Sequence, residues 1–132
     1  MHVETRGAKI LLVDDEPDMT AIVGRSLRLN GYEVLTAGDG FECLNVAESE
    51  QPDLILLDNV MPNMDGVTAM RLLREGQSTQ HIPVIIVTAL ADEATLSAAL
   101  QAGADDYVVK PFDYGELLEK IAAVLSSRPL TG

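Results

Sequence analysis

Residues 10–16 read Ile-Leu-Leu-Val-Asp-Asp-Glu, a run of four apolar residues followed at once by three acidic ones. An apolar run that does not alternate with polar residues predicts a strand buried on both faces, as in the middle of a parallel sheet. Four runs share this pattern: 10–13, 54–57, 84–87 and 107–109. Residues 32–37 are mixed in polarity, and they predict an edge strand.

Between these runs, apolar residues recur with the period of a helix. Pro17 suits the first turn of a helix and Gly31 suits its C-terminal cap. The helical patterns lie at 17–30, 41–47, 67–73, 96–100 and 117–125. Strand and helix therefore alternate along the whole chain, which predicts an α/β fold. This fold is a doubly wound five-stranded parallel sheet flanked by five helices.

The length of 132 residues suits one domain. We expect a flexible N-terminal tail over 1–8, the domain over 9–126, and a C-terminal tail or the start of a linker over 127–132. Residues 1–8 contain no apolar stretch of the kind found in secretory signals, and no run is long enough to span a bilayer. A cytoplasmic location is therefore expected. The single Cys excludes a disulfide framework.

The chain is strongly acidic, with 21 Asp and Glu against 9 Lys and Arg and a net charge of −12. Nucleic-acid binding requires clustered basic side chains that neutralise phosphates, so no direct binding of nucleic acid by this domain is expected. The same negative charge disfavours docking on anionic lipid headgroups, so no membrane partner is expected.

Chemically active side chains follow four of the five predicted strands. Asp14 and Asp15 follow the first strand, Asp58 the third, Thr88 the fourth and Lys110 the fifth. Ligand sites of doubly wound sheets form at the carboxyl ends of the strands, where the strand order reverses. If the order is 2-1-3-4-5, the first and third strands are neighbours, and their three carboxylates converge.

Three converging carboxylates repel one another and need a counter-ion. Oxygen ligands without His or Cys favour a hard cation, Mg²⁺ by preference, which leaves coordination positions for a phosphoryl group. Lys110 and Thr88 could bind the same group. Asp58 follows a fully apolar strand, and it is the best candidate for a nucleophile that forms an aspartyl phosphate.

Each of these residues also has a simple structural interpretation. Asp14 and Asp15 could cap the first helix, Asp58 could be a turn residue, and Lys110 could be a solvated surface lysine. The functional hypothesis depends on all of them following strand ends in one fold.

With these residues in place, the chain resembles the receiver domain of two-component response regulators over about residues 9–126. The matching stretches are 10–16 (ILLVDDE), 56–58 (LLD), 61–66 (MPNMDG), 87–89 (VTA) and 103–112 (GADDYVVKPF). Together they are highly specific. The resemblance implies a flavodoxin-like fold with strand order 2-1-3-4-5, the one found in chemotaxis regulators.

The resemblance also implies a switch that depends on phosphorylation. Asp58 would accept a phosphoryl group from a phosphohistidine of a sensor histidine kinase or a histidine phosphotransfer protein. Asp15 and Asp58 would bind Mg²⁺ directly, together with the backbone carbonyl of Val60, and Asp14 would act through a coordinated water.

Further residues would read the phosphorylation state. Lys110 and the Thr88 hydroxyl would contact the phosphoryl oxygens, helped by the Ala89 backbone N–H. Tyr107 would change rotamer with Thr88 and alter the surface formed by the fourth helix, fifth strand and fifth helix. The Lys110–Pro111 peptide bond would be cis. The downstream effector is not identified by the sequence.

Two departures from the family pattern carry their own expectations. Val60 and Leu90 are apolar at positions where polar side chains can position the hydrolytic water, so slow autodephosphorylation is expected. Residues 92–102 contain no Lys or Arg. Dimerisation through charged pairs between the fourth and fifth helices is therefore not expected.

Other function classes fit less well. An FMN protein of this fold needs a small-residue phosphate loop after the first strand, and a haloacid-type phosphatase needs an acid at position 60. No Walker-type loop is present for a nucleotide triphosphatase. We therefore expect a signalling domain and not an enzyme, although it would support its own phosphorylation. The alternative is a receiver-like interaction module that works without phosphorylation.

Overall fold

The computed structural model describes residues 7–127, and the predicted tails lie mostly outside this range. Strands and helices alternate as the sequence predicts. The strands are β1 (Lys9–Val13), β2 (Glu33–Ala37), β3 (Leu54–Asp58), β4 (Val84–Thr88) and β5 (Asp106–Val109). The helices are α1 (Pro17–Leu29), α2 (Gly40–Glu50), α3 (Gly66–Glu75), α4 (Glu93–Gln101) and α5 (Tyr114–Ser126).

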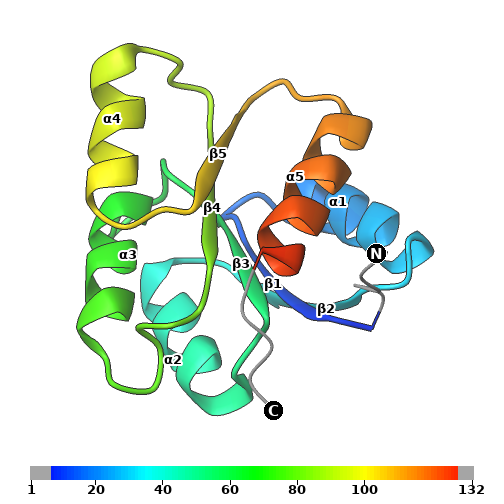
Figure 1. Cartoon of the computed structure of the whole chain (residues 1–132), viewed down its shortest axis with the longest axis horizontal. Helices are drawn as coiled ribbons and strands as arrows, with labels where there is room; N and C mark the ends of the chain where they lie inside the picture. Colours follow the sequence, from blue (N-terminus) through cyan, green and yellow to red (C-terminus); the bar gives the residue numbers. More distant parts are fainter. Residues whose placement is uncertain (1–6, 128–132) are drawn as a thin grey trace.

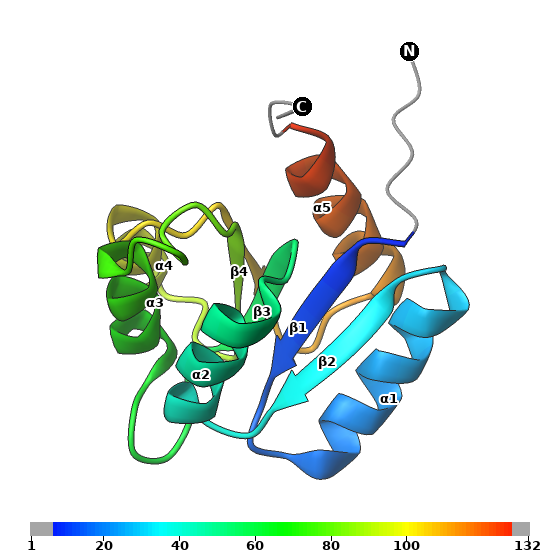
Figure 2. The ribbon, with the colours of Figure 1, turned by 90° about the horizontal axis from the view of Figure 1, so that it is seen from below.

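The five strands form one parallel sheet in the order β2-β1-β3-β4-β5, which confirms the predicted topology (Figure 1). Helices α1 and α5 cover one face, while α2, α3 and α4 cover the other (Figures 1 and 2). The order reverses between β1 and β3. These two strands are neighbours, with Val13 in register with Leu57.

The core is divided into two layers by the sheet. In β3, Leu54 and Leu56 pack beneath α1 and α5, whereas Ile55 and Leu57 pack beneath the other three helices. All five residues of this strand are buried. An apolar run that does not alternate is what a strand needs when both of its faces are covered.

The fifth strand differs from the sequence-based expectation. The run 107–109 predicts a strand buried on both faces, yet only Val108 of β5 is fully buried. This strand has a neighbour on one side alone, since it ends the sheet. The mixed polarity of 32–37 correctly predicts the other edge strand, β2.

The helix ends explain part of the acidic composition. Four helices begin with an aspartate whose carboxylate accepts a backbone N–H of the first turn: Asp39, Asp65, Asp92 and Asp113. Helix α1 begins differently, because its N-terminal cap, Glu16, makes no such side-chain bond. Among residues 7–127, no helix has the length and apolar character needed to cross a membrane.

Candidate functional site

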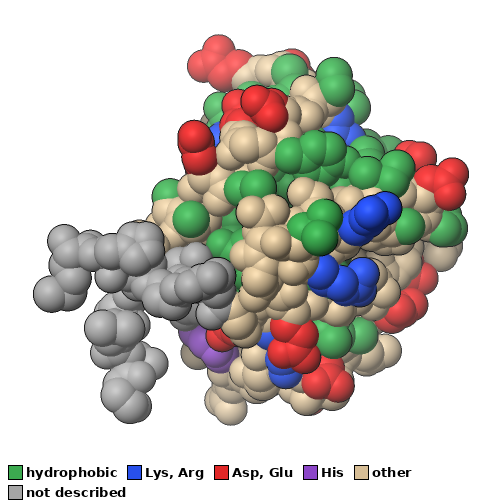
Figure 3. Space-filling view, turned by 90° about the vertical axis from the view of Figure 1, so that its right-hand side faces the viewer, with side chains coloured by type: hydrophobic (Ala, Val, Ile, Leu, Met, Phe, Trp, Pro, Cys, Tyr) green, Lys and Arg blue, Asp and Glu red, His purple; other side chains and the backbone are tan. Residues whose placement is uncertain are grey.

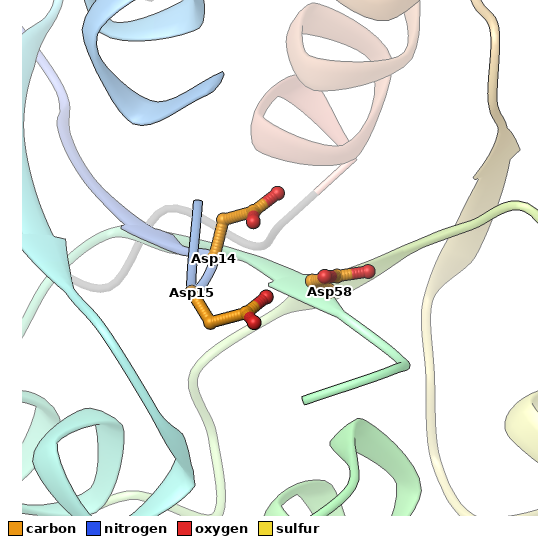
Figure 4. A group of neighbouring side chains, drawn as sticks. All are labelled: Asp14, Asp15 and Asp58. Carbon is orange, nitrogen blue, oxygen red and sulfur yellow. The ribbon is translucent and has the colours of Figure 1, made fainter. Parts of the chain in front are cut away.

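Three carboxylates gather at the carboxyl edge of the sheet. Asp14 and Asp15 directly follow β1, and Asp58 ends the neighbouring β3 (Figure 4). One carboxylate oxygen from each residue lies within 4.8 Å of one from each of the others. Asp14 and Asp58 are buried, whereas Asp15 is exposed. The structure therefore brings together the acidic cluster that the strand ends predict.

The backbone on both sides fixes these side chains. The Asp14 N–H donates to the Ala37 carbonyl of β2, and the Asn59 N–H donates to the Val87 carbonyl of β4. One Asp14 carboxylate oxygen accepts the Glu16 N–H at 2.9 Å. Asp14 thus stabilises the turn that leads into α1, while the N-cap position of that helix is occupied by Glu16.

Lys110 is the basic member of the site. Its ammonium nitrogen lies 3.2 Å from Asp14 Oδ2 and 3.5 Å from Asp58 Oδ1. The Lys110 N–H donates to the Thr88 carbonyl, and the following Lys110–Pro111 bond is cis, as expected. Burial disfavours the charge of Lys110. The two carboxylates outweigh burial, and the pKa of Lys110 is raised.

The pKa of the Asp58 carboxyl group is higher than that of an ordinary aspartate. Burial raises the pKa of Asp58 from 3.8 to about 6. Lys110 opposes this shift, the nearby charge of Asp14 adds to it, and a hydrogen bond from the Val60 N–H lowers the pKa again. The single lysine therefore does not fully compensate the charge at Asp58.

The donor set fits a hard cation. Its side-chain atoms are carboxylate oxygens, two of them on buried residues, and the raised pKa of Asp58 indicates that further positive charge would stabilise the site. Val60 lies two residues beyond Asp58 and is 59% exposed. Its carbonyl is the predicted backbone ligand.

Thr88 and Ala89 lie at the end of β4, next to the acidic cluster. Thr88 is fully buried, and its hydroxyl oxygen accepts the Leu90 N–H at 2.9 Å. Ala89 is exposed. Tyr107 lies on β5 and packs, partly buried, against the core layer beneath α2, α3 and α4. Tyr107 pairs with Ile86 of β4, two residues before Thr88.

Two neighbours of Asp58 were not singled out by sequence reasoning. Asn59 is buried, and its Oδ1 accepts no hydrogen bond from any described residue. Gly66 is the first residue of α3, directly after the cap Asp65. In the structure, a Cβ at Gly66 would lie 2.6 Å from the Asp58 carbonyl oxygen. The start of α3 therefore rests directly on the backbone of Asp58, a contact that no sequence pattern indicates.

A doubly wound sheet with three carboxylates and a lysine at its carboxyl edge is typical of a signalling receiver domain. The sequence profile of the response regulator receiver domain family matches residues 10–122. The chain belongs to this family, the receivers of two-component signalling systems.

Curated relatives include transcriptional regulators. The chain is 43% identical over 131 residues to the transcriptional regulatory protein PrrA of Mycobacterium tuberculosis, covering 99% of this chain and 55% of PrrA. It is 41% identical over 117 residues to the alkaline phosphatase synthesis transcriptional regulatory protein PhoP of Bacillus subtilis, covering 89% of this chain and 48% of PhoP. The chain thus spans about half the length of these relatives.

Solved structures show the same fold. The receiver domain of a sensor histidine kinase from Pseudomonas aeruginosa, described with magnesium coordinated in its active site cleft, superposes with a TM-score of 0.85 at 36% identity. The match covers 92% of this chain and 99% of that one. The chemotaxis protein CheY4 of Vibrio cholerae gives a TM-score of 0.85 at 32% identity, covering 89% and 98%.

Proposed function

We propose that this domain is a phosphorylation-dependent switch that accepts a phosphoryl group on Asp58. The donor is a phosphohistidine of a sensor histidine kinase or histidine phosphotransfer protein. The observation that carries the proposal is the placement of the Asp58 carboxylate. It is buried at a strand end, 3.5 Å from the Lys110 ammonium and beside two further carboxylates.

The transfer is a displacement at phosphorus. An Asp58 carboxylate oxygen forms the new O–P bond while the N–P bond of the donor histidine breaks. The leaving imidazole nitrogen keeps the electron pair of that bond and takes a proton from solvent. Lys110, already in contact with Asp14 and Asp58, pairs with the phosphoryl oxygens and stabilises the charge that develops there.

Mg²⁺ is the cofactor of this proposal. Asp15, Asp58 and the Val60 carbonyl would hold it directly, and Asp14 would hold it through a water. When bound, the cation neutralises charge on the carboxylates and the phosphoryl oxygens.

The readout follows from the change in charge at Asp58: the phosphoryl group carries about two negative charges, where the ionised carboxylate carries one. The Thr88 hydroxyl turns from the Leu90 N–H toward a phosphoryl oxygen, and the Ala89 N–H donates to the same group. Tyr107 then turns into the space that Thr88 leaves. The surface of α4, β5 and α5 changes, and an effector reads it.

The relatives' names indicate what that effector could be. They are transcriptional regulators about twice the length of this chain, so a DNA-binding output would belong to a further region of such a protein. The receiver over 9–126 binds no nucleic acid itself under this proposal, and it acts in the cytoplasm.

The test is phosphorylation by a small donor. The chain is incubated with acetyl phosphate and Mg²⁺, and its intact mass is measured. One phosphoryl adduct is expected for the wild type and for Asp18→Asn, a matched control on the exposed start of α1. No adduct is expected for Asp58→Asn or with excess chelator.

The same experiment addresses the alternative. A chain that acquires no adduct from acetyl phosphate or from a panel of phosphorylated histidine kinases is not a phosphorylation switch. That result would favour the interaction module that works without phosphorylation.

A further inference from the structure

Two side chains make hydrogen bonds to the backbone of Tyr107 on the edge strand β5. Because β5 ends the sheet, one side of its backbone has no neighbouring strand. The Tyr107 N–H donates to Asp106 Oδ1 at 2.8 Å, and the Tyr107 carbonyl accepts from the Lys120 ammonium at 2.6 Å. Lys120 belongs to α5, so this contact ties the last helix to the edge strand.

Lys120 also contacts the ring of the same tyrosine. Its ammonium nitrogen lies 4.9 Å from the centroid of the Tyr107 ring, within the range of a cation–π interaction. A third contact joins it to Asp106 Oδ1 at 3.4 Å. The Lys120 ammonium group therefore contacts the backbone and the ring of Tyr107 and the carboxylate of the preceding residue, Asp106.

These contacts respond differently to a rotation of the tyrosine side chain. The carbonyl contact depends on the backbone of β5 and survives a change of χ1. The ring contact depends on the rotamer and is lost when the ring turns away. It exists in the arrangement in which the Thr88 hydroxyl accepts the Leu90 N–H, before that hydroxyl turns toward Asp58.

We propose that Lys120 is a positioning residue that holds the Tyr107 ring in this orientation and so opposes the switch. The inference rests on the proposed function, because it assumes that the ring moves when Asp58 is modified. Losing the ring contact lowers the free energy needed to reach the switched arrangement. Any ligand that prefers that arrangement then binds more tightly.

The test measures binding of beryllofluoride, a phosphoryl analogue, in the presence of Mg²⁺ by calorimetry. Lys120→Gln keeps a donor for the Tyr107 carbonyl but carries no charge for the ring. We expect its dissociation constant to fall about two- to fivefold, the factor that a partly exposed cation–π contact carries. Lys120→Arg keeps the cation and should retain the wild-type value.

Lys9→Gln is the matched control. The Lys9 ammonium also contacts a backbone carbonyl and a carboxylate, at 3.2 Å and 3.8 Å on Glu50, and its side chain is 29% exposed against 28% for Lys120. Lys9 begins β1, which is separated from β5 and Tyr107 by two strands, β3 and β4. Its replacement should leave the beryllofluoride affinity unchanged.

A second background separates the ring from the backbone. In Tyr107→Leu, the carbonyl and Asp106 contacts of Lys120 remain possible, but no ring is present. Lys120→Gln should then have no effect on the affinity. In the otherwise wild-type chain, Lys120→Gln should also shift the NMR signals of the Tyr107 ring toward their positions in the beryllofluoride complex.

Two failures are distinguishable. If the wild type does not bind beryllofluoride with Mg²⁺, the proposed function fails and the role of Lys120 fails with it. If the wild type binds but Lys120→Gln binds equally or more weakly, only the role of Lys120 is overturned. An equal tightening in the Tyr107→Leu background would also overturn it.

Discussion

The carboxyl group of Asp58 ends a strand whose five residues are all buried, and its pKa of about 6 records the cost of that burial. A group whose pKa is raised on folding is favoured in its protonated form. Its contribution to stability is fully present below the unfolded value near 3.8 and is lost as pH rises through about 6. At neutral pH, Asp58 therefore destabilises the fold that it serves.

Asp58→Asn should accordingly stabilise the chain when divalent cations are removed. We expect a gain of about 1–3 kcal/mol in the free energy of unfolding at pH 7.5, measured by urea denaturation with a chelator present. The gain should shrink toward zero near pH 4, where the wild-type carboxyl is protonated. A loss of stability at pH 7.5, or the same gain at both pH values, would contradict this account of the site.

The apolar residues beside the site lead to a prediction about phosphoryl lifetime. Val60 and Leu90 follow Asp58 and Thr88 by two residues, and both are exposed. Neither apolar side chain can hydrogen-bond a water for attack on the phosphoryl group. Val60→Asn or Leu90→Glu should accelerate loss of the adduct several-fold, measured as the decay of phosphorylated protein after donor removal. Leu29→Asn, a polar replacement of an exposed apolar residue at the end of α1, should decay like the wild type. Equal decay in all four proteins would show that a missing polar group does not limit hydrolysis.

At the level of elements, the start of helix α3 packs closely against the backbone of Asp58. A Cβ at Gly66 would lie 2.6 Å from the Asp58 carbonyl oxygen and 2.8 Å from the Asn59 Cα. Both atoms belong to the backbone, so the strand end must move to accommodate a side chain.

Gly66→Ala should therefore destabilise the fold by about 1–3 kcal/mol and slow phosphorylation at Asp58. Gly115→Ala is the control, because a Cβ there meets only ordinary contacts within the first turn of α5. We expect that variant to be as stable as the wild type or slightly more so. Denaturation midpoints and rates of adduct formation measure both effects, and equal behaviour of the two variants would argue against the packing of α3 on Asp58.

Buried central strands can be predicted from the sequence, but the position of a strand at the edge of the sheet cannot be predicted from its apolar run alone. Buried strands are predictable because a chain covered on both faces needs uninterrupted apolar residues, as in 54–57. The same reasoning fails for 107–109, because the run does not reveal that the strand lies at an edge. The acidic cluster is predictable because parallel strands end at one side of the sheet.

Contacts between distant elements are not predictable in this way. The packing of Gly66 on Asp58 and the contact of Lys120 with Tyr107 depend on the exact placement of a helix on the sheet. No period or spacing in the sequence encodes either contact.

At the scale of the whole molecule, the net charge of −12 divides into parts with different roles. Three carboxylates form the site, and four others cap helices. On the face in Figure 3, acidic side chains are spread around the margin, while apolar and basic side chains occupy its middle. On this face, therefore, the acidic side chains do not gather into one patch. Phosphate chemistry is compatible with the net negative charge because Lys110 supplies positive charge at the site.

Phosphorylation at Asp58 is tested most directly by chemical identification of the modified residue. The chain is treated with acetyl phosphate and Mg²⁺, reduced with borohydride, digested and mapped by mass spectrometry. Borohydride reduces an aspartyl phosphate to homoserine, so we expect homoserine at position 58 and at no other position. Reduction at another carboxylate, or no reduced residue in a chain that has acquired a phosphoryl group, would contradict it.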